Sequence, residues 1–123
     1  MKKLRLAVAL VPVLAVAAAA APVSSVCTFM TPSGQAQARF DIDNLLVRST
    51  LSVNGVSIPN LQPACILHPR GGLRCPHGDG ARRYEIYPYI DDATNKVVGM
   101  RALVYQGDAD NPTPIEQADC SSL

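Results

Sequence analysis

Residues 63–78 read PACILHPRGGLRCPHG, and the rest of the chain is best interpreted outward from this stretch. Cys65 and Cys75 stand near its two ends, and Gly71-Gly72 lies between them at a natural turning point. In an oxidising compartment such a stretch forms a small hairpin closed by a disulfide, whereas in a reducing one the same cysteines can hold a metal. The compartment therefore decides which of the two structures is expected.

The N-terminus indicates export. Three basic residues within positions 2–5 precede an uncharged apolar run over positions 6–21, which ends in consecutive alanines. A basic start, a short apolar core and small residues at its end are typical of a secretory signal peptide. The run is shorter than a membrane-spanning helix and Pro12 interrupts it, so a retained membrane anchor is the weaker alternative. We predict a signal peptide over 1–21 and a single secreted, extracellular domain over 22–123.

Export makes a disulfide framework the expected use of the four cysteines in the chain. Four cysteines allow three pairings. We favour a pairing of Cys65 with Cys75, as a staple on a local hairpin, and of Cys27 with Cys120, as a clasp between the two chain ends.

Cys65, His68, Cys75 and His77 are also the residue types of a Cys2His2 zinc site. Their spacing differs from the usual finger pattern, because only one residue separates Cys75 from His77. Oxidised thiols do not ligate zinc. For an exported protein we therefore expect the disulfide, no metal and no other cofactor.

Alternation of apolar and polar residues predicts strands before the cysteine stretch. Residues 40–53 follow this pattern, although a helix over 42–49 is a competing interpretation. Asn54-Gly55 stands between LSV and VSI and is the strongest hairpin signal of the sequence, which favours strands. Residues 27–37 have a turn-like composition, with a turn expected over 31–34.

The same reasoning predicts two strands after the cysteine stretch. Residues 83–90 (RYEIYPYI) alternate, and their Pro88 belongs at a sheet edge or a bulge. Residues 91–95 form a turn, and residues 96–105 (KVVGMRALVY) pair with the preceding strand, before a loop over 106–114. The predicted fold is mainly β, a small antiparallel β-sandwich or barrel stabilised by two disulfides.

The charge distribution suggests a binding surface. Three of the eleven basic residues lie in the predicted leader, which leaves eight against ten carboxylates and argues against a generally basic, nucleic-acid-coating protein. Residues 68–83 are nevertheless basic, with Asp79 as their one carboxylate, whereas residues 108–119 are acidic. The predicted binding residues are His68, Arg70, Arg74, His77, Arg82 and Arg83.

Glu85, with a histidine (His68 or His77) and an arginine (Arg82, Arg83 or Arg101), supplies the residue types that RNA cleavage by 2′-OH attack requires. Tyr84-Glu85 and the later NKVVGMRALV resemble elements of the small, guanyl-specific secreted fungal ribonucleases. That resemblance implies a catalytic histidine on the last strand, and residues 101–105 contain none. Without that histidine, the resemblance implies a catalytically dead copy that works by binding, as the ribonuclease-like effectors of fungal plant pathogens do.

A second resemblance covers more of the chain. ARFDIDNLLVRS at 38–49, the loop from Cys65 to Cys75, RYEIYPYI, VVGMRALVY and a late cysteine follow one another in this order. The order is similar to that of the secreted fungal β-barrel family typified by the Alternaria major allergen. The resemblance implies an elicitor or effector that acts on plant hosts without established catalytic residues. The chain is short for a full barrel of that type.

Both resemblances imply the same biology. We expect a secreted effector or virulence-type protein of a filamentous fungus that binds a host protein or other host component, and that is not an enzyme. We expect no membrane association after leader cleavage. The alternatives are a ribonuclease-like protein that binds RNA, active or catalytically dead, and a structural component of a wall or coat.

Overall fold

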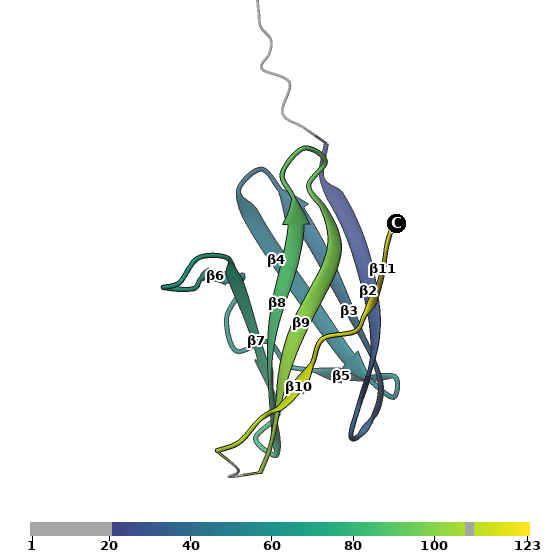
Figure 1. Cartoon of the computed structure of the whole chain (residues 1–123), viewed down its shortest axis with the longest axis vertical. Helices are drawn as coiled ribbons and strands as arrows, with labels where there is room; N and C mark the ends of the chain where they lie inside the picture. The colour runs from purple at the N-terminus through teal and green to yellow at the C-terminus, as the bar shows by residue number, and fades with distance from the viewer. Residues whose placement is uncertain (1–20, 108–109) are drawn as a thin grey trace, which may run out of the picture.

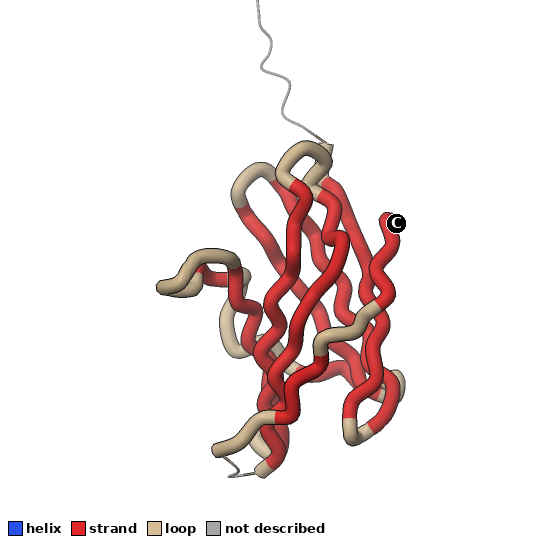
Figure 2. Tube along the Cα trace, in the orientation of Figure 1, coloured by secondary structure: helices blue, strands red, loops and turns tan. Residues whose placement is uncertain are grey.

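The computed structural model describes residues 21–107 and 110–123, so nearly all of the predicted signal peptide lies outside the described residues. All regular structure in these two ranges is β-strand, as Figure 2 shows. Ten strands form two five-stranded antiparallel sheets that enclose one hydrophobic core. The prediction of an antiparallel β-sandwich is confirmed. Among the described residues, no helix has the length and apolar character that a membrane span requires.

The first sheet has the order β11-β2-β3-β4-β5. Tight turns join its consecutive strands, and asparagines with positive φ stand at two of them, Asn44 and Asn54. The second of these is the predicted Asn54-Gly55 hairpin, in which Val53 pairs with Val56. The strands are β2 (Val23–Thr31), β3 (Gly34–Asp43), β4 (Leu46–Val53), β5 (Val56–Ile58) and β11 (Asp119–Ser122).

The second sheet has the order β10-β9-β8-β7-β6. Its two long central strands form the predicted hairpin around the 91–95 turn, and the short β6–β7 hairpin projects from the side of the sandwich (Figure 1). The strands are β6 (Ile66–Leu67), β7 (Leu73–Gly78), β8 (Arg82–Asp91), β9 (Lys96–Gln106) and β10 (Thr113–Ile115).

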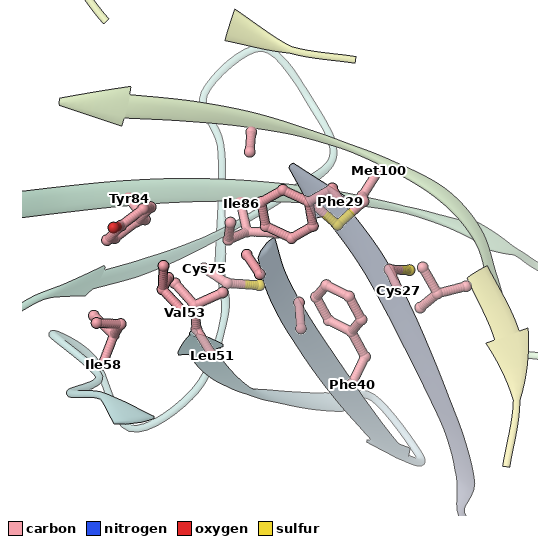
Figure 3. Close-up of a cluster of buried hydrophobic side chains, with 14 of the residues drawn as sticks. Cys27, Phe29, Phe40, Leu51, Val53, Ile58, Cys75, Tyr84, Ile86 and Met100 are labelled. Carbon is pink, nitrogen blue, oxygen red and sulfur yellow. The ribbon is translucent and has the colours of Figure 1, made fainter. Parts of the chain in front are cut away.

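The core fills the space between the sheets with alternate side chains of the facing strands (Figure 3). Phe40, Leu51 and Val53 come from the first sheet, and Tyr84 and Ile86 come from the second. Burial of these apolar side chains supplies the main favourable term for folding.

Two buried serines connect the sheets by hydrogen bonds. The backbone N–H of Val97 in β9 donates to Oγ of Ser25 in β2 over 3.1 Å. Oγ of Ser49 in β4 lies 2.8 Å from Nε2 of His77 in β7. Buried polar groups of this kind cost free energy unless they are paired, so they fix how one sheet sits on the other.

Both predicted disulfides are present. The Cys27–Cys120 bond joins β2 to β11, the two strands formed by the ends of the domain, over a sequence separation of 93 residues. The Cys65–Cys75 bond closes the β6–β7 hairpin over a separation of 10 residues. The Cys65–Cys75 bond oxidises both thiols that a Cys2His2 zinc site would need as ligands.

The structure decides three local interpretations of the sequence. Residues 27–37 are not a turn-like segment but the β2–β3 hairpin, whose turn falls within the predicted 31–34 stretch. The helix considered over 42–49 is absent from this described stretch, where Asn44-Leu45 forms a turn between two strands and Leu45 is fully exposed. Pro88 fits its expected setting, because β7 pairs with β8 only from Ile86 back to Arg83 and the register shifts just after Tyr89.

Candidate binding face

The outward side of β7, β8 and β9 carries arginines and tyrosines arranged around one glutamate. Because Tyr84 and Ile86 of β8 point into the core, the residues between and after them point outward. Cross-strand pairing then places Arg83 opposite Tyr105, and Tyr87 opposite Arg101. We call this surface the arginine–tyrosine face; it consists of Arg74, Arg83, Glu85, Tyr87, Arg101 and Tyr105.

Glu85 is the centre of this face. The Tyr87 hydroxyl donates a hydrogen bond of 2.9 Å to its Oε1. Its Oε2 lies 3.6 Å from the Arg74 guanidinium and 3.7 Å from the Arg83 guanidinium. Burial, together with the hydrogen bond to Glu85 and its charge, raises the pKa of Tyr87 above its usual value. One carboxylate thus holds two cations and a phenol in fixed positions.

Two tyrosine rings pack against arginine guanidiniums on this face. The Arg83 guanidinium carbon lies 3.9 Å from the centroid of the Tyr105 ring, and that of Arg101 lies 5.7 Å from the Tyr87 centroid. Both distances fall within the range of cation–π contacts. The Arg83 side chain is nevertheless 52% exposed, so its charge is positioned and still open to solvent.

A groove of about 420 Å³ lies between the β6–β7 loop and the adjoining part of this face. The loop that forms its wall is held by two backbone hydrogen bonds of 2.9 Å, from His68 N–H to Gly72 O and from Gly71 N–H to His68 O. Gly71 and Gly72 both have positive φ, a conformation that suits glycine. The groove is lined by His68, Arg70, Leu73, Tyr87, Tyr89 and Arg101, among others.

A larger hollow of about 510 Å³ lies where the chain crosses from β10 to β11. It is lined partly by Phe29 and Met30 of β2, with Glu116 and Asp119 on the other side. None of the residues predicted to bind a partner lies in it.

The structure brings together four of the six predicted binding residues. His68 and Arg70 line the groove, and Arg74 and Arg83 belong to the arginine–tyrosine face. Arg82 points to the other side of β8, where it contacts Asp79 over 3.2 Å and approaches the Tyr84 ring.

His77 does not belong to the binding surface, contrary to the prediction, because its side chain is fully buried between the sheets. Its place in β7, two residues after the buried Cys75, puts it on the core side of the strand. Burial lowers the pKa of His77 from 6.5 to about 4, although the nearby backbone of Ile58 opposes the shift. The imidazole is therefore neutral in the folded protein at neutral pH.

Sequence reasoning missed the tyrosines of this surface and assigned Arg101 only to the nuclease alternative. The alternation of residues in β8 contains the signal that was missed. Arg83, Tyr87 and Tyr89 lie on one side of this strand, and its other side is mostly apolar. Aromatic residues in a strand, however, are more often interpreted as core.

The geometry limits what chemistry the face can perform. His68 is the one histidine of the two in the chain that lies at this surface, where its ring makes an edge-on contact with Tyr87. Both oxygens of Glu85 are already engaged by neighbouring donors. Acid–base catalysis here would thus depend on Glu85 and His68, whereas the paired arginines suit recognition of an anion.

No protein-family model, no curated protein and no solved structure matches this chain.

Proposed function

We propose that this chain is a secreted fungal effector that binds a host component without catalysis, and that the arginine–tyrosine face with its groove is the recognition surface. The observation that carries the proposal is the stacking of the Arg83 guanidinium 3.9 Å from Tyr105, in a position that remains half exposed. The two disulfides and the lack of a membrane-spanning helix among the described residues are compatible with an extracellular protein.

The composition of the face supports binding. Arginine and tyrosine are enriched at the centres of protein interfaces and among the residues that dominate binding energy. The face is built on paired strands, and its guanidiniums are held by Glu85 and by aromatic rings. Few of its side chains therefore lose further conformational freedom when a partner binds. Three arginines around one glutamate favour a partner with negative charge.

The proposal is tested by retention on plant tissue, the host class that both resemblances imply. Labelled, disulfide-bonded protein is applied to leaf sections, and the retained fraction is compared between the wild type and the double variant Arg83→Ala/Tyr105→Ala. We expect the variant to lose at least tenfold in retention. Arg39→Ala is the matched control, because Arg39 is an exposed, ion-paired arginine of the other sheet. Equal retention of all three proteins contradicts the proposal.

A ribonuclease-like activity is the second candidate, because Glu85, Tyr87 and His68 form one contiguous cluster. It is examined by degradation of single-stranded RNA by the wild type, Glu85→Gln and His68→Ala. Cleavage by the wild type that is lost in either variant would replace the binding function with a catalytic one. For the binding function we expect no cleavage above the level of a buffer control.

A further inference from the structure

Tyr89 forms a platform at the groove. It lies directly opposite Gly99 in the β8–β9 pair, and a Cβ at Gly99 would come within 3.3 Å of Cδ2 of Tyr89. The tyrosine ring therefore leans over the glycine, an arrangement in which an aromatic side chain covers a cross-strand glycine. The residue is still 53% exposed, so the other side of the ring is open to solvent.

Donors for an anion stand around this platform. Arg70 and Arg101 both line the groove, and Arg70 makes no ion pair with any residue in the described part of the chain. Arg101 lies 4.0 Å from Glu116, whose side chain is 72% exposed, so that contact is weak and easily exchanged.

His68 adds a further donor. Its Nδ1 accepts the backbone N–H of Arg70 over 3.1 Å, so Nε2 is the ring nitrogen that can donate to a ligand. Because the loop that carries both residues is closed by the Cys65–Cys75 disulfide and by its backbone hydrogen bonds, the backbone positions of these donors are fixed before any ligand arrives.

We propose that the groove binds an acidic sugar, with a pyranose ring stacked on Tyr89 and its carboxylate held by Arg70 and Arg101. This inference rests on the proposed binding function and assigns the ligand class of its groove. The aliphatic C–H groups of a sugar ring suit the negative face of an aromatic ring. A carboxylate matches the forked geometry of a guanidinium. The volume of about 420 Å³ is within the range of small-molecule sites.

The charge around the groove favours a ligand that places one carboxylate there over a nucleic-acid strand. Two guanidiniums line the groove, and the Glu116 carboxylate stands beside one of them, so a single carboxylate suffices to balance the local charge. A longer polyanion would also meet the net negative charge of residues 22–123, in which ten carboxylates outnumber eight basic residues. Strands of nucleic acid require several phosphate contacts and stacking residues in series, which is more than this groove alone provides.

The experiment is isothermal titration calorimetry of the disulfide-bonded protein with trigalacturonic acid at 0.15 M salt. The matched ligand is its fully methyl-esterified form, which keeps the rings and removes the charge, and a short single-stranded RNA is the third ligand. We expect saturable binding of the acid, at least tenfold tighter than binding of the ester or the RNA. No saturable binding of the acid, equal binding of the ester, or tighter binding of the RNA would overturn the proposal.

Variants distinguish stacking from charge. Tyr89→Ala is expected to weaken binding of the acid at least tenfold, whereas Tyr89→Phe, which keeps the ring, stays within threefold of the wild type. Arg70→Ala is expected to reduce the preference for the acid over the ester at least fivefold. Arg39→Ala, on the other sheet, is expected to leave this binding unchanged; unaltered binding by Tyr89→Ala would refute the platform. If trigalacturonate fails while retention on tissue still depends on Arg83 and Tyr105, only the sugar assignment is lost.

Discussion

Nε2 of His77 and the hydroxyl of Ser49 meet at 2.8 Å in the interior of the sandwich, and the contact joins β7 of one sheet to β4 of the other. Both side chains are almost entirely removed from solvent. A polar contact so placed determines how the sheets align, and it makes the core sensitive to protonation.

Ser49→Ala tests the contact directly. The substitution leaves the imidazole of His77 buried without its partner on β4, and an unsatisfied buried group costs about 1–3 kcal/mol. We therefore expect the free energy of unfolding, measured by urea denaturation at pH 7.5, to fall by that amount. Ser57→Ala, at an exposed position of β5, is the control and should change it little. A loss of equal size in both variants would show that the inter-sheet bond contributes nothing specific.

The pH dependence of stability follows from the same residue. The pKa of His77 is about 4 in the folded protein, against 6.5 for an ordinary histidine, so the unfolded chain binds the proton more readily. Stability is fully present above pH 6.5 and is lost as pH falls toward 4, by up to about 3 kcal/mol. Urea unfolding at several pH values measures this loss, and His77→Gln should remove it from the profile. An equal pH dependence of the unfolding free energy in the wild type and the variant would show that His77 is not the group responsible.

The two disulfides should differ in their contribution to stability. Cys27 and Cys120 are separated by 93 residues in the sequence, whereas Cys65 and Cys75 are separated by 10. In the chain-entropy model, we expect Cys27→Ala/Cys120→Ala to cost about 4–5 kcal/mol and Cys65→Ala/Cys75→Ala about 2–3 kcal/mol. Thermal or urea unfolding of the two double variants checks the order. A larger loss from the short loop would show that local packing outweighs loop closure.

A contact between two hairpin turns gives a fourth prediction. A Cβ at Gly34 would collide with the side chain of Asn54, whose amide is fixed by a 2.6 Å hydrogen bond to the Ser33 carbonyl. Gly34 also has φ of 130°, so Gly34→Ala should cost about 1–3 kcal/mol in unfolding free energy.

Two further variants separate the collision from the backbone strain. Gly55→Ala carries a positive φ but meets no neighbouring atom, so it should cost less than Gly34→Ala. Asn54→Gly removes the obstacle, so the double variant Gly34→Ala/Asn54→Gly should lose less stability than the sum of the two single changes. If the stability loss of the double variant equals the sum of the two single losses, the cost of Gly34→Ala comes from backbone strain alone.

The sequence predicted the Asn54-Gly55 hairpin and the hairpin around residues 91–95 because turn residues are a local signal. No local pattern links Cys27 to Cys120; that bridge was favoured because four cysteines allow only three pairings, and one of them ties the two chain ends together. The first strand escaped prediction for a physical reason. Its core-facing positions hold Ser25, Cys27, Phe29 and Thr31, so small and polar side chains concealed the alternation. Their burial depends on partners far along the chain, such as Val97, which no local pattern contains.

The arginine–tyrosine face was predictable in part. The basic residues on both sides of Gly71-Gly72 stand out by charge, and four of the six predicted positions do lie on this face or in the groove beside it. The misplacement of His77 arose because a histidine suggests a surface or a ligand, whereas strand parity with Cys75 determines its side. The stacking of Arg83 on Tyr105 depends on the β8–β9 register, which is set by the turn between the strands together with the shift after Tyr89, and not by Arg83 or Tyr105.

The bond between Cys27 and Cys120 also has a mechanical consequence. Every strand from β3 to β10 lies inside the loop that it closes. Tension applied to the two chain ends would pass from Cys27 to Cys120 through the disulfide, and the sandwich between them would carry almost none of it. Reduction would release a tether of roughly 300 Å when fully extended. In single-molecule pulling, the oxidised domain should therefore lengthen only by its short outer segments, and a reductant should convert it into a long, compliant chain.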